Sequence, residues 1–258
     1  MAYVKPKKKL GQHFLKDQSI AQQIVDLLSG HQNYKYLLEI GPGTGVLTKL
    51  LLPSSDFQLR VIEIDTESVD YLLKELKVPA HQIVEGDFLR LPATSYFGEE
   101  AYAIIGNFPY NISSQIFFKV LENRDQIKEV VGMLQKEVAE RICAKPGGKT
   151  CGILSIFMQA FYDCEYHFTV PPEVFNPPPK VQSGVLRLRR NDTKKLDCDE
   201  KWFFKIVKQG FNNRRKTLRN ALKSLNFPKE LMQDEVFSQR AEQLSVQDFV
   251  LITKQLAS

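Results

Sequence analysis

The chain has 258 residues, of which 43% are hydrophobic and 25% are charged, and its net charge is +5. This composition is that of an ordinary soluble globular protein, and the sequence has no run of about eighteen apolar residues, which excludes a membrane-spanning helix. The basic N-terminus has no apolar signal-peptide core, and the four cysteines and four histidines are too scattered for a zinc site or a disulfide framework. We therefore expect a cytoplasmic protein without a metal.

The first half of the chain alternates two sequence patterns. Five segments have the apolar pattern of buried strands: 36–40, 59–65, 82–89, 102–108 and 129–135. Helical patterns lie between them; in residues 66–76, for example, apolar side chains recur at helical spacing. Strands that alternate with helices predict an α/β fold, a doubly wound, Rossmann-like parallel sheet with helices on both faces.

The alternation of strand and helix patterns ends after residue 150. Residues 151–190 contain one helical pattern and two β-rich runs around a proline-rich loop, which we interpret as a pair of strands that closes one edge of the sheet. A polar linker follows. Only helices are predicted beyond it, over 202–211, 214–225 and 245–256. The predicted organisation is therefore a sheet domain over 1–190 and a small all-helical domain over 191–258.

A glycine-rich segment, EIGPGTG (39–45), follows the first predicted strand and opens a helix. Gly41 and Gly43 let the backbone approach a ligand closely. The third glycine position of a dinucleotide fingerprint is Val46 in this chain, and Glu63 ends the second strand, where a carboxylate can accept hydrogen bonds from both ribose hydroxyls of an adenosine. NAD and S-adenosylmethionine share that adenosine, so these features alone leave both cofactors open.

A second carboxylate, Asp87, stands at the end of the third predicted strand. It can accept a hydrogen bond from the exocyclic amine of an adenine, with Phe88 packed on the ring. Gly41, Glu63 and Asp87 all fall at the carboxyl ends of successive strands, which is where open α/β sheets bind ligands. We therefore predict a site for an adenosine-containing cofactor at this edge of the sheet.

The fourth predicted strand ends in the segment IGNFPYNISS (105–114), whose proline stops the strand. Its end faces the cofactor, because the fourth strand lies beside the first in such sheets. The side-chain oxygen of Asn107 and the backbone carbonyl of Phe108 can hold both hydrogens of an amine on a base, so that the amine lone pair points at a methyl carbon. Pro109 stiffens the turn, and Tyr110 offers a face on which an unpaired base can stack. The segment favours methyl transfer from a sulfonium to a base, with no covalent nucleophile.

Eight segments together carry a resemblance to a known family. They are GQHFL, EIGPGTG, VIEID, EGDFL, GNFPYNISS, MLQKEVAERI, PPEVFNPPPKVQSGVLRL and RRKTLRNAL. From about Leu10 to the C-terminus, the chain resembles the ribosomal RNA adenine dimethyltransferases, and within them the bacterial small-subunit (16S) branch linked to kasugamycin sensitivity. The resemblance implies S-adenosylmethionine as cofactor. It also implies dimethylation of N6 on two adjacent adenines, in the 3′-terminal hairpin loop of 16S rRNA, within a late precursor of the small (30S) ribosomal subunit.

The resemblance also implies roles for particular residues. The family's Asn-Leu-Pro-Tyr motif matches residues 107–110, with Phe108 in place of the usual leucine, whose backbone alone is thought to act. His13 and Leu15 match cofactor-contacting positions, and some members have asparagine where His13 stands. Phe175, in the proline-rich loop, matches an aromatic residue that sandwiches the target base against the tyrosine of the motif.

Two basic clusters predict contact with a polyanion. One lies at the N-terminus between Lys5 and Lys9. The other consists of Arg214, Arg215, Lys216, Arg219 and Lys223. If 214–225 is a helix, its leucines share one face, and Arg215, Arg219 and Lys223 share another. A solvated face explains this pattern equally well, but a family that works on a ribosomal particle favours salt-sensitive contact with RNA phosphates.

Other functions are compatible with parts of the sequence. A 23S rRNA adenine methyltransferase of the macrolide-resistance type shares the catalytic motif, although RRKTLRNAL favours the 16S type. A DNA adenine methyltransferase would need an extra target-recognition domain, and an NAD-dependent oxidoreductase leaves the NFPY segment unexplained. Relatives that serve as transcription or assembly factors bind RNA or protein without catalysis; the intact segment 107–110 and Glu63 argue against that role. We expect a monomer that binds neither membranes nor DNA.

Overall fold

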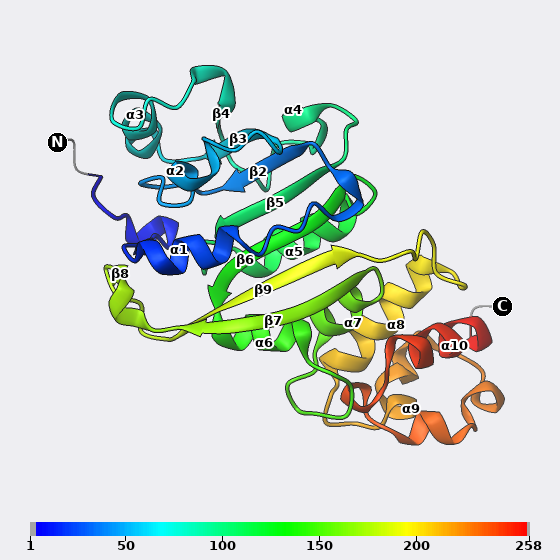
Figure 1. The fold of residues 1–258 in the computed structure, drawn as a ribbon. Helices are drawn as coiled ribbons and strands as arrows, with labels where there is room; N and C mark the ends of the chain where they lie inside the picture. Colours follow the sequence, from blue (N-terminus) through cyan, green and yellow to red (C-terminus); the bar gives the residue numbers. More distant parts are fainter. Residues whose placement is uncertain (1–3, 257–258) are drawn as a thin grey trace. The chain divides into compact units, whose positions relative to one another are not determined.

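The computed structural model describes residues 4–256, and the chain divides into two compact units (Figure 1). The first unit runs to Ala139 and resumes over Cys164–Arg190, while the second comprises Glu140–Asp163 and the residues from Asn191 onward. The chain passes from the first unit to the second for the last time after Arg190. The domain border predicted from the sequence falls at this residue. The second unit also takes in Glu140–Asp163, which that border assigned to the sheet domain.

A seven-stranded sheet with the order β4-β3-β2-β5-β6-β9-β7 runs through the first unit. Its strands are β2 (Tyr36–Ile40), β3 (Gln58–Glu63), β4 (Ile83–Glu85), β5 (Tyr102–Asn107), β6 (Ile127–Gln135), β7 (Tyr162–Val170) and β9 (Ser183–Arg190). Strands β2 to β6 are parallel to their neighbours, and β9 is antiparallel to β6. The five predicted strands are confirmed, β5 lies beside β2 as expected, and β7 and β9 close one edge.

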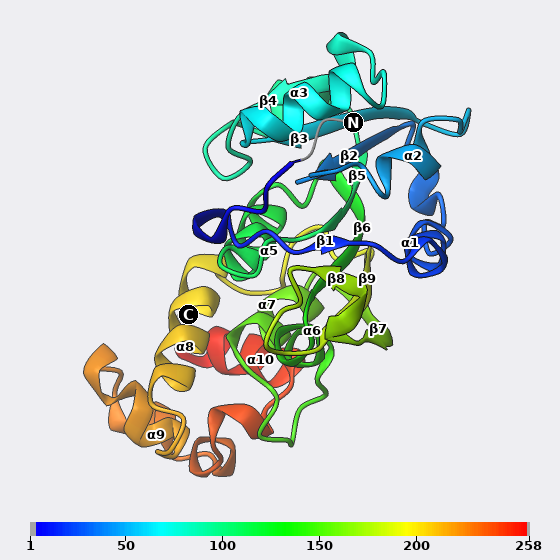
Figure 2. The same cartoon turned by 90° about the vertical axis from the view of Figure 1, so that its left-hand side faces the viewer.

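Helices cover both faces of this sheet, as the alternating pattern predicted. They are α1 (Gln18–Val25), α2 (Thr48–Leu51), α3 (Thr66–Lys74), α4 (Thr94–Phe97), α5 (Ser113–Glu122) and α6 (Lys136–Cys143). Ile24, Leu51 and Leu72, from the first three helices, pack into one core with side chains from alternate strand positions. Ile116 and Val120 of α5 are fully buried on the other face, and Figure 2 shows α1 and α5 on opposite sides of the strands.

A second, two-stranded sheet joins segments that lie far apart in the sequence. Strand β1 (Phe14–Leu15) pairs antiparallel with β8 (Phe175–Asn176), and Leu15 lies opposite Phe175. Short 3₁₀ turns occur nearby and elsewhere in the unit: η1 (Lys8–Leu10), η2 (His31–Asn33), η3 (Ala80–Gln82) and η4 (Pro172–Val174). The pairing of β1 with β8 fixes the N-terminal segment against the proline-rich loop.

The second unit is built mainly from helices. These are α7 (Ile153–Gln159), α8 (Glu200–Asn212), α9 (Leu218–Ala221) and α10 (Val246–Leu256), with 3₁₀ turns η5 (Leu222–Leu225), η6 (Lys229–Met232), η7 (Glu235–Ser238) and η8 (Ala241–Gln243). Its core is aromatic: the ring centroids of Phe157 and Phe204 are 4.7 Å apart, and those of Phe211 and Phe249 are 6.2 Å apart. In the part of the chain that the structure describes, no helix is long and apolar enough to cross a membrane.

The predicted helix over 214–225 is wrong in its first part. Residues 214–217 form a turn, and α9 begins only at Leu218. The turn has a packing reason: Leu218 is fully buried, and a Cβ at Gly210 of α8 would lie 3.1 Å from its Cδ1. The chain must reverse direction sharply to bring α9 that close to α8. Arg215 consequently lies outside the helix and does not share a helical face with Arg219 and Lys223.

Candidate active site

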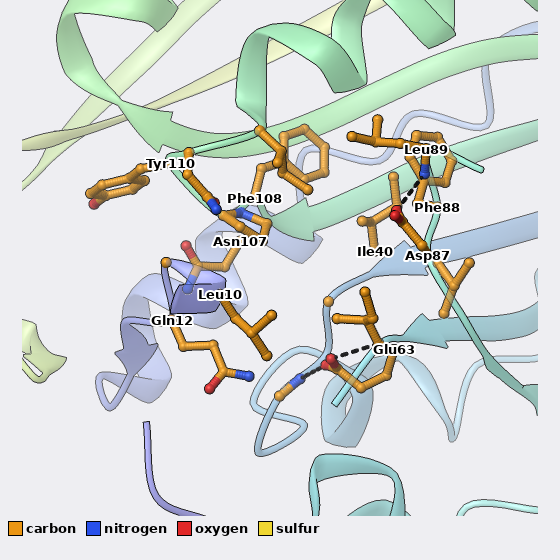
Figure 3. A pocket seen from close by; sticks show the side chains of 18 of the residues that line it. Leu10, Gln12, Ile40, Glu63, Asp87, Phe88, Leu89, Asn107, Phe108 and Tyr110 are labelled. Atoms are coloured by element: carbon orange, nitrogen blue, oxygen red, sulfur yellow. Dashed lines mark hydrogen bonds between the residues drawn. The ribbon is translucent and has the colours of Figure 1, made fainter. Parts of the chain in front are cut away.

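The carboxyl ends of β2, β3, β4 and β5 meet around one pocket (Figure 3). With its open mouth included, the hollow measures about 880 Å³. The segment Asn107–Ile112 and the N-terminal segment Leu10–Phe14 also line it. Of the residues predicted from the sequence, the pocket brings together His13, Gly41, Gly43, Glu63, Asp87, Asn107, Phe108, Pro109 and Tyr110.

The glycine loop after β2 has a backbone that only glycine adopts easily. Gly41 and Gly43 have positive φ angles of +65° and +55°. A Cβ at Gly43 would lie 2.6 Å from the ring of Phe14, so this position accepts no side chain. The loop therefore both turns the chain and lets the N-terminal segment lie directly against it.

Glu63 ends β3 beside this loop and is only 4% exposed. Its carboxylate accepts three backbone hydrogen bonds, from Gly43 at 3.1 Å and from Ile64 and Asp65 at 2.9 Å. Burial raises the pKa of Glu63, and the three backbone donors oppose that rise. The donors fix the carboxylate in one orientation, and its remaining lone pairs can accept hydroxyl groups from the pocket. Ile64, which sequence reasoning missed, is 50% exposed and lines the same pocket as an apolar wall.

A buried carboxyl lies behind this site, in the strand β2. Glu39 is 1% exposed, and its Oε2 accepts a hydrogen bond of 2.6 Å from the hydroxyl of Thr48. Burial raises the pKa of Glu39 to about 8, and the nearby Glu63 carboxylate adds to the rise. The glycine motif EIGPGTG contained Glu39, but nothing in its spacing showed that burial raises the pKa of this carboxyl.

Asp87 and Phe88 follow β4 and line the pocket across from Asn107 (Figure 3). Oδ1 of Asp87 accepts a hydrogen bond of 2.9 Å from the backbone of Leu89, and Nε of Arg90 lies 3.4 Å from Oδ2. Phe88 is only 4% exposed, with its ring centroid 6.0 Å from that of Tyr96. The carboxylate is thus the polar group that this loop presents to a ligand.

Asn107 ends β5, and its amide has a fixed orientation. Nδ2 donates a hydrogen bond of 2.8 Å to the backbone carbonyl of His13. Because that carbonyl takes up the donor end, the oxygen is the end available to a substrate amine. The backbone N–H of Phe108 donates to the carbonyl of Met133 at 2.8 Å, which fixes the peptide between Asn107 and Phe108. The carbonyl of Phe108 belongs to the following peptide, with Pro109, and is the second hydrogen-bond acceptor at the end of β5.

Tyr110 lies one turn further, and its ring is stacked. The His13 ring lies 5.3 Å from the Tyr110 ring, centroid to centroid, with an interplanar angle of 29°. Nδ1 of His13 is 2.7 Å from the carbonyl oxygen of Pro177, which can only accept a hydrogen bond. The Tyr110 hydroxyl pairs with that of Ser183 at 2.5 Å, and burial raises the pKa of Tyr110. A histidine from the N-terminal segment thus covers the tyrosine face that the sequence assigned to a base.

Two predicted site residues lie in the core instead. Phe175 was expected to face Tyr110 across the target base, but it is 1% exposed and belongs to the hydrophobic core of the first unit. Leu15, expected to contact the cofactor, is 3% exposed in the same core. The antiparallel pairing of β1 with β8 places these two residues opposite each other and directs both side chains inward. Neither lines the pocket.

The sequence did not predict how the N-terminal segment is held. Lys7 forms ion pairs with Asp65 and Glu67, and Nε2 of Gln12 lies 3.3 Å from Oδ2 of Asp65. Burial alone would raise the pKa of Asp65, but its hydrogen bonds to Lys7, Gln12 and Ser68 lower it below the ordinary value. The basic arm is therefore anchored to the end of β3 in this structure, and Gln12 lines the pocket.

The basic residues expected to bind RNA lie in the second unit. Arg214, Arg215, Lys216, Arg219 and Lys223 are all exposed. Two of them also form hydrogen bonds with the backbone. Arg214 donates to the carbonyl of Lys149 and Arg219 to that of Met232, each at 2.8 Å. Their contact with RNA remains a prediction. Within residues 4–256, no group of three or more His, Cys, Asp or Glu side chains is arranged to hold a metal ion.

Comparisons with known proteins agree on one family. Residues 4–258 match the family model described as ribosomal RNA adenine dimethylase. A relative from Cytophaga hutchinsonii, named ribosomal RNA small subunit methyltransferase A, is 58% identical over 257 residues, covering 100% of this chain and 99% of its own. A Flavobacterium johnsoniae protein of the same name is 56% identical over 256 residues, covering 99% and 97%.

Two solved structures share this fold. A dimethyladenosine transferase from Plasmodium falciparum is similar with a TM-score of 0.77 and 27% identity, covering 93% of this chain and 96% of its own. The 23S rRNA methyltransferase ErmE gives a TM-score of 0.67 at 24% identity, covering 95% and 100%, which shows a shared fold. The Rossmann-like methyltransferase sheet predicted from the sequence is thereby confirmed.

Proposed function

Because the chain belongs to the ribosomal RNA adenine dimethylase family, we propose that its pocket binds S-adenosylmethionine and delivers two methyl groups to N6 of each of two adjacent adenines in 16S rRNA. Family membership makes the protein an rRNA adenine dimethyltransferase. The two adenines of the 3′-terminal hairpin loop, within a late precursor of the small subunit in the cytoplasm, are the substrate that the resemblance implies. The fixed amide of Asn107 at the end of β5, across the pocket from Glu63 and Asp87, is the observation that carries the proposal.

The pocket fits the adenosine end of this cofactor. Glu63 presents a buried, oriented carboxylate for the ribose hydroxyls, and Asp87 presents a second carboxylate for the adenine amine. Ile64 offers an apolar surface to the same pocket. Gly41, with its positive φ, removes a side chain where the remainder of the ligand would pass. S-adenosylmethionine supplies an electrophilic methyl group on a sulfonium when it is bound.

The residues after β5 prepare the amine to attack. An adenine amine is a poor nucleophile because its lone pair is delocalised into the ring. Oδ1 of Asn107 and the carbonyl of Phe108 accept its two hydrogens, so that the lone pair turns toward the methyl carbon and the developing positive charge meets fixed dipoles. The backbone of His13 holds the Asn107 amide in this orientation. A flipped or unpaired base can stack on Tyr110 once the His13 ring moves aside.

Methyl transfer to isolated ribosomal particles tests this function directly. Labelled S-adenosylmethionine is incubated with small subunits that lack the dimethyladenines, with large subunits and DNA as controls, and the digested RNA is analysed by mass spectrometry. We expect dimethyladenine in the 3′-terminal hairpin of 16S rRNA. Label in the large subunit would assign the protein to the 23S type. Cofactor binding without any label would favour a non-catalytic assembly factor.

A single substitution tests the role of the amide. Asn107→Ala removes one preorganised acceptor, so kcat should fall by about 10²–10³-fold while S-adenosylhomocysteine still binds. Gln23→Ala, at an exposed amide on α1, is the matched control and should retain full activity. Wild-type turnover by Asn107→Ala would remove the residue from the catalytic mechanism.

A further inference from the structure

A lysine from α5 reaches the loop that carries Asp87 and Phe88. The ammonium group of Lys119 donates hydrogen bonds to the backbone carbonyls of Phe88 and Leu91. Its Nζ also lies 4.8 Å from the centroid of the Phe88 ring, within the distance of a cation–π interaction. One side chain therefore holds this loop at two backbone positions and one ring.

The loop is also held by local contacts: the backbone N–H of Leu89 donates to the Asp87 carboxylate, and the Tyr96 hydroxyl lies 3.5 Å from the carbonyl of Phe88. The loop follows β4, a strand of three residues at the edge of the sheet that pairs only with β3. Within the loop, backbone bonds from Arg90 and Leu91 return to the carbonyl of Asp87, at 3.0 and 3.1 Å. Carbonyls in such a loop need donors, and an ammonium donor gives stronger hydrogen bonds than a neutral one. Lys119 supplies two of them from a rigid helix.

The same helix contacts the segment that carries the catalytic amide. α5 begins at Ser113, directly after the segment Asn107–Ile112, and its Phe117 ring packs edge-on against Phe108 with centroids 5.9 Å apart. Lys119 lies two residues further along α5. The helix is thus attached at one point to the residues that would hold the target amine and at another to the residues that would hold the cofactor's adenine.

We propose that Lys119 is a positioning residue, which holds the Asp87 carboxylate and the Phe88 ring where they recognise the six-amino group of the cofactor's adenine. The inference rests on the proposed function, because it takes the ligand beside Asp87 to be an adenine. Burial lowers the pKa of Lys119, and the Asp87 and Glu122 carboxylates oppose that effect. The ammonium group of Lys119 is therefore partly removed from water, and it contacts the loop instead.

Two ligands test the proposal; they differ in the six-substituent of the purine and in the hydrogen that the inosine ring carries on N1. S-inosylhomocysteine has a carbonyl where S-adenosylhomocysteine has the amine, so an acceptor such as Asp87 faces another acceptor and binding weakens. We expect Lys119→Met, which keeps the apolar stem but removes the donors, to lower the preference for S-adenosylhomocysteine by about tenfold in calorimetry. Lys119→Arg, which keeps a cation with several donors, should restore part of that preference.

The controls separate this inference from the proposed function. Lys74→Met, at an exposed lysine on α3 that pairs with Asp70, should leave the preference unchanged. Thermal unfolding shows whether Lys119→Met is folded; a folded variant with wild-type preference between the two ligands would overturn the role of Lys119. If the wild-type protein itself bound both ligands equally, the adenine site beside Asp87 would be wrong. If it bound neither, the proposed cofactor would be wrong.

Discussion

Two glycines make room for the ring of Phe108, at the position where the sequence resemblance led us to expect leucine. Gly106 on β5 and Gly132 on β6 lie directly opposite each other in the sheet. The Phe108 ring, which is 1% exposed, covers both. A Cβ at Gly132 would lie 2.4 Å from its Cε2, and a Cβ at Gly106 would lie 2.9 Å from its Cε1. The larger motif residue and the two small strand residues therefore form one packing unit behind the catalytic segment.

We expect Gly132→Ala to displace the Phe108 ring and to impair catalysis. Overpacking of this kind costs about 1–3 kcal/mol of the free energy of unfolding, and for a chain of this length the Tm falls by about 2–4 °C per kcal/mol. The displaced ring also pulls on the peptide that the Met133 carbonyl holds, beside Asn107. Each 1.4 kcal/mol lost from the stabilisation of the transition state lowers kcat about tenfold.

A second substitution shows whether the loss of Tm and activity comes from a clash with the Phe108 ring. Leucine at 108 is shorter than phenylalanine, so Phe108→Leu should recover most of the Tm and activity lost in Gly132→Ala. Gly106→Ala is the matched case that leucine should not rescue, because a Cβ there would also lie 2.6 Å from the backbone carbonyl oxygen of Ile40. A backbone atom in the middle of a sheet cannot move aside as a side chain can.

Thermal unfolding and single-turnover methyl transfer measure both effects in the same variants. Calorimetry with S-adenosylhomocysteine shows whether the cofactor pocket is intact. If Gly132→Ala unfolds at the wild-type temperature and reacts at the wild-type rate, the ring does not depend on that glycine. If leucine at 108 rescues Gly132→Ala and Gly106→Ala equally, the carbonyl of Ile40 is not the obstacle that the structure indicates.

Two further predictions concern the buried carboxyl of Glu39 and the basic residues of the second unit. Folding raises the pKa of Glu39 from 4.5 to about 8, so the folded state keeps a proton that the unfolded state releases, and stability falls as pH rises across that range. The Tm of Glu39→Gln should fall less than that of the wild type between these pH values; equal slopes would show that another group is responsible. Replacing Arg215 and Lys223 by serine spares the bond from Arg219 to Met232, and it should lower the salt slope of subunit binding by about 1–2. Filter binding measures that slope with Lys201→Ser as control, and an unchanged slope would make both residues part of an ordinary solvated surface.

Most of the candidate site was predictable because its signals are local. Strands β2, β3 and β5 are apolar runs that stop at Gly41, Glu63 and Asn107, and parallel strands bring their carboxyl ends to one edge. The order of the strands is enough to place these residues around one pocket. The same reasoning placed Asp87, which stands two residues after β4.

The predictions that failed depend on contacts between distant segments. Whether Leu15 and Phe175 face the pocket or the core is decided by the register of β1 against β8, and a shift of one residue would reverse both side chains. The turn over 214–217 is decided by the fit of Leu218 against Gly210, although the segment itself has a helical pattern. The role of Lys119 could not be predicted either, since its two hydrogen bonds go to backbone carbonyls, which carry no sequence information.

The contact between residue 13 and Asn107 orients a catalytic side chain but does not require a particular amino acid at position 13. The Asn107 amide is oriented by the backbone carbonyl of His13, so any residue at position 13 can hold it, provided that the segment keeps its path. That path depends on Gly43, which lets Phe14 lie on the glycine loop, and on Lys7, whose ion pair with Asp65 anchors the arm. The histidine ring is then available for another purpose, which here is to cover Tyr110. Because the backbone of residue 13 holds the amide and its side chain does not, asparagine at this position would leave Asn107 oriented as histidine does.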